Sequence, residues 1–490
     1  MKVAFVTPEL HSLVRRTNLA GVAQDLARAL RNAGADCRVF MPRTVAVEAE
    51  KLIDLETVAT VQVGDLDGKF NFDVQRGHLE DLPIYLIDQP QLLGSRHPYA
   101  DEEGPYVDNW RRYALFSRAL LEALPALDFT PDVIHGLDWT FGMLPVFHKL
   151  DYLGKDNGHP SERAGTFFSI HNLAMQGAFE REILPRLGLP HDLFRAVDGV
   201  ELSGKVNFLK AGAEFATVIG THSPSHAEKI QETDRGYGLE DTFQRRKKEL
   251  LGIHNGVDYA AWDPQTDPLL VSNFGPKDVD NAGKRKCKAD LQSALQLDVS
   301  PKTLLACHIG RWDADSGFDL LAEVLALLLE HDVELVAMGA GGEEVTRRLR
   351  TIESTFVGRL RVIEGYDAAA AHRLMAGADV LLLPSHYQPT NPLAAIALRY
   401  GVLPILFKES GLEETLPSIE DDPNRGLSLH FSPYTGDGLL QTVLKAAELQ
   451  GTEAWVATVK RLLAVDFSWD NTAAEYIKAY RRVTRRIRGR

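Results

Sequence analysis

Apolar and polar positions follow one repeating order through the first half of the chain. Short, continuously apolar runs are separated by stretches such as residues 19–30, where Leu19, Val22, Leu26 and Leu30 recur at helical spacing. The predicted strands cover residues 3–7, 37–41, 84–87, 132–135, 166–171 and 217–221, and the predicted helices cover residues 19–30 and 109–124. Continuously apolar strands separated by helices indicate a parallel sheet covered on both faces.

A second series of the same kind follows the segment "GIHNGVDYAAWDPQTDP". Its predicted strands cover residues 304–309, 333–338, 360–364, 380–383 and 403–407, with helices at 318–329, at 369–375 and from about 393. Gly, Pro and Asp cluster near residues 256–270, which places a domain boundary there. The pattern therefore predicts an α/β protein with two doubly wound domains. We expect a ligand in a cleft between the carboxyl ends of their strands.

Composition narrows the class of protein. The 490 residues exceed what one hydrophobic core usually serves, and the net charge of −14 disfavours a general nucleic-acid binder. The basic clusters "RRKK" at 245–248 and "RRVTRRIRGR" at the end of the sequence are expected to be solvated helix faces.

No apolar run is long enough to span a bilayer, and no signal-peptide pattern follows the first strand. Cys37, Cys287 and Cys307 form no CxxC pair, so we expect neither disulfides nor zinc, and a cytoplasmic location.

Two loops carry candidate anion-binding residues. In "HSLVRRTNLAGVAQDL", Asn18 is a candidate N-cap, and Arg15 and Arg16 stand before the positive end of the helix. In "HIGRWDADSGFDLL", Arg311 directly follows the predicted strand, and residues 315–317 are expected to cap the next helix. Each loop fits a phosphate site, because free N–H groups and arginine both bind phosphate oxygens. Each also fits a plain cap with surface ion pairs, such as Arg311 with Asp313 or Asp315.

Two further loops, "HGLDWTFGMLP" and "SIHNLAMQGAF", lie at predicted strand ends. His171 directly follows the apolar run 167–170, where side chains point into the expected cleft. A single histidine at such a place more often has a structural role. Asp138 and Trp139 are ambiguous in the same way.

The order of these segments resembles the bacterial glycogen synthase and plant starch synthase family. The matching segments, which run almost end to end, are "KVAFVTPE", "YVDNWRRYALFSRALLE", "HGLDW", "SIHNLAMQGAF", "VNFLKAG", "RGYGLE", "GIHNGVDYAAWDPQTDP", "KCKADLQ", "GRWDADSGFDLL", "EGYDAAAAHRLMAGADVLLLPS", "ALRYGVLPI" and "DFSW". The resemblance implies a GT-B fold with domains at 1–256 and 257–470 and a last helix within 471–490 that returns to the first domain. It also implies retaining transfer of glucose from ADP-glucose to an α-1,4-glucan, without a cofactor, a metal or a membrane.

The resemblance carries roles to individual positions. His171 matches the family histidine beside the donor sugar, Arg311 the phosphate-binding arginine, and Tyr366 the tyrosine near the adenine ring. Gln388 stands at the position of a family glutamate and is the third candidate catalytic residue, with His171 and Arg311. The remaining candidates are Asp138, Asn172 and Gln176 on the sugar and acceptor side, and Arg15, Asn18, Ser316, Tyr366, Thr390 and Asn391 on the donor and phosphate side.

The departures from the family pattern are equally specific. The family sequence Lys-Thr-Gly-Gly-Leu-Ala-Asp is replaced by residues 15–21, "RRTNLAG", so that Asn18 adds a side chain where a diphosphate approaches the backbone. The lysine partner of the phosphate-binding arginine falls on Ser316. The family sequence Glu-Pro-Cys-Gly-Leu falls on residues 388–392, "QPTNP", where Pro392 removes a backbone N–H. A second glutamate found in many related transferases falls on Ile396, and the histidine after the "DW" pair is Thr140.

Losing one well-placed electrostatic contact typically costs on the order of 3–4 kcal/mol in a transition state. Three hypotheses follow: a glucosyltransferase with reduced activity, a non-catalytic relative that binds glucan or nucleotide and acts as a partner or regulator, and an enzyme with a changed donor or acceptor. Arg16 is a candidate replacement for the charge missing at Ser316.

A dinucleotide-dependent dehydrogenase is disfavoured, because "TPELHSLVRR" contains no GxGxxG turn. A metal site at "DAD", residues 313–315, is also disfavoured.

Overall fold

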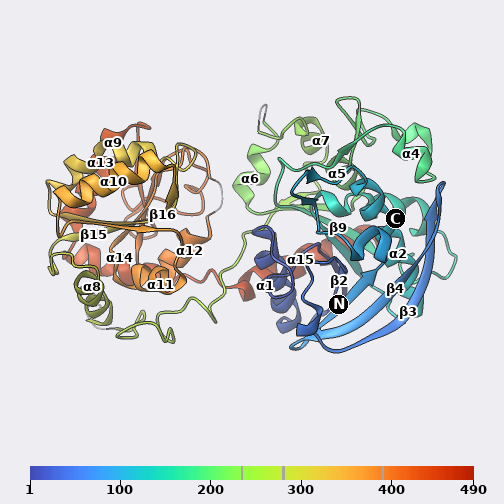
Figure 1. Cartoon of the computed structure of the whole chain (residues 1–490), viewed down its shortest axis with the longest axis horizontal. Helices are drawn as coiled ribbons and strands as arrows, with labels where there is room; N and C mark the ends of the chain where they lie inside the picture. The colour runs from blue at the N-terminus through green and yellow to red at the C-terminus, as the bar shows by residue number, and fades with distance from the viewer. Residues whose placement is uncertain (233–234, 279–281, 389–390, 490) are drawn as a thin grey trace. The chain divides into compact units, whose positions relative to one another are not determined.

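The computed structural model describes residues 1–232, 235–278, 282–388 and 391–489. The chain divides into two compact units: the first consists of Met1–Gly256 with Trp469–Arg490, and the second of Val257–Ser468. Each unit contains a sheet with helices packed against it (Figure 1). Within the described residues, no helix is both long and apolar enough to cross a bilayer.

The first unit is built on a nine-stranded sheet in the order β14-β13-β9-β8-β1-β2-β5-β4-β3. The strands are β1 Lys2–Val6, β2 Asp36–Pro42, β3 Ile53–Asp65, β4 Gly68–Leu79, β5 Leu82–Asp88, β8 Val133–Leu137, β9 Gly165–Ile170, β13 Val218–Thr221 and β14 Leu250–Gly252. The strands from β14 to β5 pair in parallel, whereas β4 and β3 add an antiparallel hairpin at one edge.

Helices cover both faces of this sheet. They are α1 Leu19–Asn32, α2 Asn109–Ala126, α3 Met143–Phe147, α4 Ile183–Arg186, α5 Phe208–Phe215, α6 Pro224–Lys229, α7 Glu240–Arg245 and α15 Trp469–Arg488. The shorter elements are β6 Ala100–Asp101, β7 Gly104–Pro105, β10 Ala178–Phe179, β11 Glu201–Leu202, β12 Lys205–Asn207, η1 Ala49–Lys51, η2 Pro90–Gly94, η3 Trp139–Phe141, η4 His148–Tyr152 and η5 His191–Leu193. Because successive side chains of a strand point to opposite faces, Val3 and Phe5 join one core with α1 and α15, whereas Ala4 and Val6 join another with α2, α3 and α5.

The C-terminal helix α15 belongs to the first unit. It packs against α1, and Figure 1 shows it in red among the blue elements α1 and β2. The Tyr480 hydroxyl of α15 lies 2.8 Å from Nδ1 of His135 on β8, and Nε2 of His135 lies 2.7 Å from the Ser169 hydroxyl on β9. The last helix therefore reaches the centre of the sheet through buried side chains.

The second unit has a six-stranded parallel sheet in the order β17-β16-β15-β18-β19-β20. The strands are β15 Leu304–Trp312, β16 Val333–Gly341, β17 Leu360–Glu364, β18 Val380–Leu383, β19 Leu403–Phe407 and β20 Leu429–Phe431. The helices are α8 Ala282–Ala294, α9 Phe318–Leu329, α10 Glu343–Thr355, α11 Ala368–Gly377, α12 Pro392–Arg399, α13 Gly436–Leu449 and α14 Glu453–Ala464. Counted along the chain, this order is 3-2-1-4-5-6, the doubly wound arrangement that binds ligands at the carboxyl ends of its strands.

The predicted α/β class with parallel sheets is confirmed, and each predicted strand overlaps an observed one. The hairpin of β3 and β4 was not predicted, because most of β3 is partly or fully exposed and offers no continuous apolar run. Arg311 lies within β15 rather than after it, because the strand continues to Trp312.

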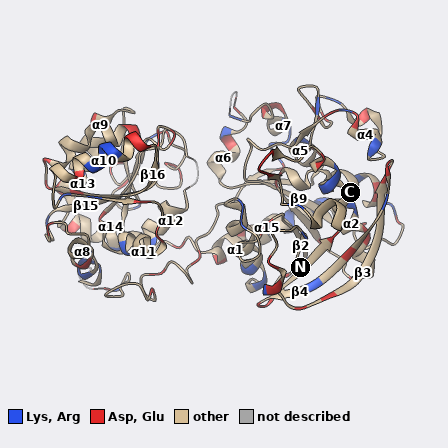
Figure 2. Ribbon diagram, viewed as in Figure 1, with Lys and Arg blue, Asp and Glu red and all other residues tan. Residues whose placement is uncertain are grey.

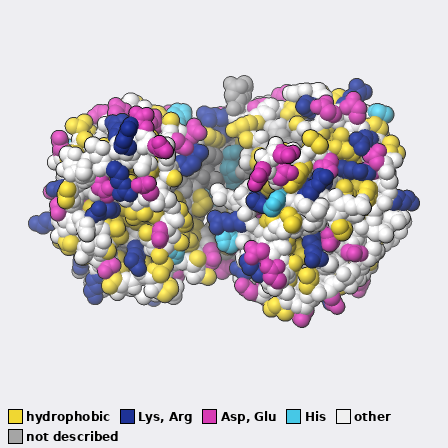
Figure 3. Space-filling view, in the orientation of Figure 1, with side chains coloured by type: hydrophobic (Ala, Val, Ile, Leu, Met, Phe, Trp, Pro, Cys, Tyr) yellow, Lys and Arg dark blue, Asp and Glu magenta, His cyan; other side chains and the backbone are white. Residues whose placement is uncertain are grey.

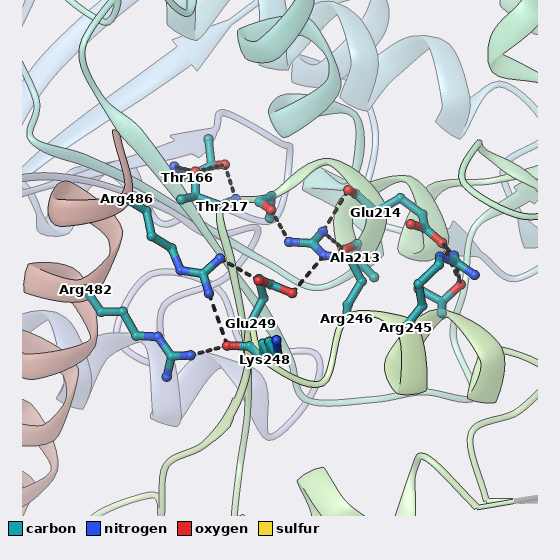
Figure 4. Close-up of polar contacts among 12 residues, drawn as sticks. Thr166, Ala213, Glu214, Thr217, Arg245, Arg246, Lys248, Glu249, Arg482 and Arg486 are labelled. Atoms are coloured by element: carbon teal, nitrogen blue, oxygen red, sulfur yellow. Dashed lines mark hydrogen bonds and ion pairs between the residues drawn. The ribbon is translucent and has the colours of Figure 1, made fainter. Parts of the chain in front are cut away.

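In the basic cluster at 245–248, Arg245, Lys247 and Lys248 are exposed as expected, but Arg246 is half-buried and turns to the end of α5 (Figure 4). The Arg246 guanidinium donates to the carbonyl oxygens of Ala213, Glu214 and Ala216 at 2.5, 2.7 and 2.7 Å. These carbonyls end α5 and have no partner further along the helix, so the arginine supplies their missing donors.

The same network attaches the last helix to the first unit. Arg486 of α15 binds Glu249 at 2.5 Å, Arg482 donates to the carbonyl of Lys248, and Arg245 pairs with Glu214 (Figure 4). Part of the terminal basic run is therefore used in internal contacts.

Charges of both signs are mixed over the rest of the chain. Basic and acidic residues lie close to one another along the helices of each unit (Figure 2). On the face drawn in Figure 3, the dark blue and magenta side chains are likewise interspersed with apolar ones. The face in view shows no continuous basic surface of the kind that a nucleic-acid binder uses.

Replacing Arg246 tests the role of this network. Because Arg246→Ala removes three charge-assisted hydrogen bonds at the end of α5, we expect a loss of about 2–3 kcal/mol. Calorimetry should show the first unit unfolding roughly 4–10 °C lower. The control is Lys247→Ala, which removes an exposed neighbouring cation and should leave the transition unchanged. Equal effects of the two substitutions would contradict the assignment.

Candidate active site

The carboxyl ends of β8 and β9 bring together three of the predicted site residues. Asp138 directly follows β8, and its Oδ1 accepts the backbone N–H of His171 at 2.7 Å and that of Asn172 at 3.3 Å. Asp138 is 8% exposed, and burial raises the pKa of its carboxyl to about 7 despite these two bonds. Asp138 therefore fixes the backbone that carries His171, rather than offering a free carboxylate.

The His171 imidazole lies at this edge, and one of its two nitrogens has no partner among the described residues. Its Nε2 is buried and has no hydrogen bond to any described residue. Burial lowers the pKa of His171 to about 4, so the ring is neutral near pH 7. A neutral imidazole with an unpaired nitrogen can form a hydrogen bond with a hydroxyl of a ligand such as a sugar.

Asn172 and Gln176 differ in how far their side-chain polar atoms are already hydrogen-bonded within the protein. The Asn172 side chain is exposed, and its Oδ1 accepts the N–H of Ala174 within its own turn at 3.0 Å. Gln176 donates to the carbonyls of Leu173 and Tyr237, and its Oε1 accepts from Asn207 at 2.6 Å. Gln176 thus ties its loop to the start of α5, a structural role that the sequence did not predict.

The loop before α1 is organised by a residue that the sequence analysis missed. The buried carboxylate of Glu9 accepts the backbone N–H groups of Arg16, at 2.5 Å, and Thr17, at 2.8 Å, together with the hydroxyl of Tyr99. Asn18 precedes α1 as predicted, but its side chain makes no cap bond; Thr17 Oγ1 accepts the N–H of Leu19 instead. The sequence signal available for Glu9 was an acidic residue two positions after the apolar run 3–7.

Arg15 and Arg16 are both exposed at the same loop. Arg16 contacts Nδ1 of His97. This contact directs one guanidinium toward the segment 97–103, where Arg16, Tyr99 and an acidic run line a cavity of about 730 Å³. Thr140, at the position of a family histidine, is buried, and its hydroxyl donates to Leu137.

In the second unit, Arg311 lies at the carboxyl edge of the sheet with 69% of its side chain exposed. Its Nε lies 3.3 Å from Asp313, and Asp315 lies 4.0 Å away. The surface ion pair considered in the sequence analysis is therefore present, and an anion would compete with two carboxylates for this guanidinium.

Ser316 is followed by Gly317, whose backbone lies close to that of Pro384. Its N–H donates to Asp313, and Gly317, with φ +70°, precedes α9 without a side-chain cap. A Cβ on Gly317 would lie 2.1 Å from the carbonyl oxygen of Pro384, so only glycine fits there. Gly317 is the N-cap residue of α9, within the predicted segment 315–317, but no side chain of that segment makes a cap bond, and Asp313 makes the bond to the turn instead.

Ser385 joins Ser316 to Gln388. Its hydroxyl lies 3.2 Å from the Ser316 carbonyl oxygen and 3.2 Å from Gln388 Oε1, so its one proton is shared between two acceptors. Asn391 Nδ2 also donates to Gln388 Oε1, at 3.2 Å. The fold therefore brings together Ser316, Gln388 and Asn391; Thr390 lies outside the described residues.

The start of α12 has its amide groups occupied by the chain itself. The Asn391 side chain accepts the N–H of Leu393 at 2.9 Å, and the Asn391 carbonyl accepts that of Ala394 at 3.0 Å. Pro392 has no N–H to offer. The helix start that would hold phosphate is therefore self-capped, and Ile396 faces the core at 6% exposure.

Tyr366 follows β17 and is 64% exposed, which leaves its ring accessible. Among the described residues, no cluster of three or more His, Cys, Asp or Glu side chains is arranged to hold a metal ion.

Returning amide groups to α12 should strengthen anion binding. Asn391→Gly with Pro392→Leu frees the N–H of Leu393 and adds one at position 392, so we expect ADP to bind about tenfold more tightly. Isothermal titration calorimetry measures the change. Thr452→Gly, which removes the comparable cap of α14, is the control and should not alter ADP binding. Unchanged affinity in the double variant would show that this helix start takes no part in binding.

Comparison with known proteins agrees with this arrangement. A model of the starch synthase catalytic domain matches residues 2–245. The chain is 33% identical over 492 residues to the glycogen synthase of Geotalea daltonii, covering 99% of each chain. It is 35% identical over 486 residues to the glycogen synthase of Anaeromyxobacter sp. (strain Fw109-5), covering 98% of this chain and 99% of that one.

A solved structure shows the same similarity. The catalytic domain of starch synthase IV from Arabidopsis thaliana, bound to ADP and acarbose, has a TM-score of 0.81 and 27% sequence identity, covering 99% of each chain. The predicted GT-B class of fold and the predicted resemblance are confirmed. The chain belongs to the glycogen synthase and starch synthase family of glycosyltransferases.

Proposed function

We propose that this protein is a retaining glucosyltransferase that transfers glucose from ADP-glucose to the non-reducing end of an α-1,4-glucan. The observation that carries the proposal is the similarity to glycogen synthases over 98–99% of the chain. The bond between glucose C1 and the diphosphate breaks, and a bond from C1 to the acceptor O4 forms on the same face of the ring. The acceptor proton leaves with ADP, so no cofactor is needed.

The described residues support specific roles in this reaction. Asp138 holds the backbone of His171, whose unpaired Nε2 would accept a hydrogen bond from a hydroxyl of the donor glucose. Arg311 would bind the diphosphate, and the exposed ring of Tyr366 would stack on the adenine. Gln388 can hydrogen-bond a sugar hydroxyl but cannot supply the negative charge of a glutamate.

We propose further that transfer is slow. Ser316 is neutral, Arg311 is paired with Asp313, and the amides at the start of α12 are occupied internally. Each of these features reduces the charge available to a departing diphosphate. The same features also fit the second candidate function, in which the protein binds glucan or nucleotide without catalysing transfer.

A transfer assay distinguishes the two functions. With radiolabelled ADP-glucose and glycogen, we expect incorporation roughly a hundredfold or more below that of a family member that retains the lysine and the glutamate. UDP-glucose in parallel tests for a changed donor. Incorporation at the rate of that relative would contradict the proposed impairment. Glycogen binding without any incorporation would favour the non-catalytic role.

Restoring the two missing charges tests where the impairment arises. Gln388→Glu with Ser316→Lys should raise the transfer rate by roughly ten- to a hundredfold, because Ser385 and Asn391 can donate to a carboxylate as they do to the amide oxygen. The control is Gln441→Glu with Ser354→Lys, the same change of charges at exposed positions of the same unit. No gain in the site variant would place the impairment elsewhere.

A further inference from the structure

The second unit contains a cavity at the amino-terminal edge of its sheet. Its volume is about 290 Å³, and it is lined by α8, the end of α13, α14 and the loop before β15. Helices α8 and α14 lie on the same side of this sheet (Figure 1). Asp379, which lines the cavity, directly precedes β18, whereas Ser385 and Gln388 follow the carboxyl end of the same strand. The cavity is therefore separate from the candidate active site.

A buried ion pair forms the floor of this cavity. Lys288 Nζ lies 2.6 Å from Asp379 Oδ2 and donates to the carbonyl of Thr303 at 2.6 Å. Lys288 is 5% exposed and Asp379 is 7% exposed. Gln450 Nε2 donates to the same carboxylate oxygen at 2.9 Å. These bonds hold the floor in place without a ligand.

The oxygen of the Gln450 amide has no partner. Gln450 Oε1 is buried and accepts no hydrogen bond from any described residue. Turning the amide over would point this oxygen at the Asp379 carboxylate, so the ion pair fixes its orientation. Buried polar atoms are normally hydrogen-bonded, and an amide oxygen can only accept. The floor therefore presents an acceptor that suits a hydroxyl or N–H group of a ligand.

The residues around the cavity carry more positive than negative charge. Lys284, Arg285 and Lys288 line it, and Asp379 is the one acidic residue among the described residues that do so. Lys284 is buried and donates to three main-chain carbonyls. Arg285 is exposed, and no acidic side chain of the described residues pairs with it. A negatively charged group is therefore favoured at the exposed end of the cavity, where Arg285 can bind it.

Apolar side chains supply the rest of the wall. Val299 is 60% exposed, whereas Trp455 and Val459 are 7% and 1% exposed. An apolar group placed against them would remove the surface of Val299 from water, which is favourable. The exposed end thus offers a cation and a valine, and the buried end offers a hydrogen-bond acceptor. A ligand that matches this order has an anionic end, an apolar body and a donor at the far end.

We propose that this cavity binds a small organic acid that has an apolar body and a hydroxyl group at the end opposite its carboxylate. The carboxylate binds Arg285, the body packs against Val299 and Trp455, and the hydroxyl donates to Gln450 Oε1. The ligand is small, because the volume lies near the lower limit of ligand pockets. Binding here is independent of the proposed transfer reaction, and no covalent bond changes.

Binding of 3-(4-hydroxyphenyl)propanoate to the full-length protein tests this site. Its carboxylate and its hydroxyl lie at opposite ends of an apolar ring. We expect ligand-observed NMR titration to give a dissociation constant on the order of 0.1–1 mM, typical of so small a ligand. Absence of binding to the unchanged protein would overturn the proposal, and this measurement needs no variant to fold.

Two analogues of the probe test its two ends. 3-Phenylpropanoate lacks the hydroxyl and should bind roughly tenfold more weakly, because Gln450 Oε1 would stay unpaired. Tyramine has an ammonium in place of the carboxylate and should not bind. Equal binding of 3-phenylpropanoate and the probe would contradict the role of Gln450, and equal binding of tyramine would contradict the preference for an anion.

A matched pair of variants tests the position of the carboxylate. Arg285→Gln should weaken binding of the probe roughly tenfold, because it removes a charge-assisted contact at the exposed end. Lys286→Gln removes an exposed neighbouring cation of α8 that does not line the cavity, and it should leave binding unchanged. Equal effects of the two substitutions would reduce the result to general attraction of anions and overturn the site.

Two competitors test the ligand class and the location. Glucose 1-phosphate is anionic and hydroxylated but has no comparable apolar body, so it should not displace the probe. Displacement by it at lower concentration than the probe would overturn the proposed class of ligand. ADP should not displace the probe either, because the cavity lies at the opposite edge of the sheet from the candidate active site. Competition by ADP would place the probe at that active site and overturn the proposal.

Discussion

The carboxylate of Asp138 controls how the first unit presents its candidate site. It accepts the N–H groups of His171 and Asn172 from a buried position where ionisation is unfavourable, as its raised pKa of about 7 shows. Asp138 also has a φ of +56°, a conformation that a non-glycine residue holds only when its surroundings enforce it. The enforcing contacts form a chain: Tyr480 of α15 contacts His135, His135 contacts Ser169, and the Ser169 carbonyl accepts the Asp138 N–H at 2.8 Å. A helix from the far end of the sequence therefore supports the backbone of His171.

The second unit shows the opposite use of hydrogen bonds, because the chain supplies its own partners where a ligand would bind. Asn391 occupies the amide of Leu393, and Asp313 holds both Arg311 and the turn at Ser316. A diphosphate bound here, as proposed, would have to replace these contacts rather than fill empty ones, and the free energy of replacement would be subtracted from that of binding. The substitutions seen in the sequence thus have a physical consequence beyond the loss of charge. They give the unliganded site a stable structure of its own.

The sequence predicted the strands of both sheets because these strands are buried on both faces and read as continuous apolar runs, as β15 and β16 do. Residues at their carboxyl ends, such as His171 and Arg311, could be located for the same reason. The capping roles could not: Asn18 and Asn391 both precede helices, but only Asn391 makes the side-chain bond, because Thr17 and Glu9 satisfy the turn before α1. Side-chain bonding of this kind depends on residues that are distant in sequence.

The histidines at the carboxyl edge of the first sheet show a further limit of reading the sequence. His171, His222 and His254 follow three different strands, and only the order β14-β13-β9 brings these strand ends together. Burial lowers the pKa of all three imidazoles, because the charged ring would lose its hydration there. Their uncharged state near pH 7 is therefore a property of the packed sheet edge, and it does not follow from the positions of the histidines along the chain.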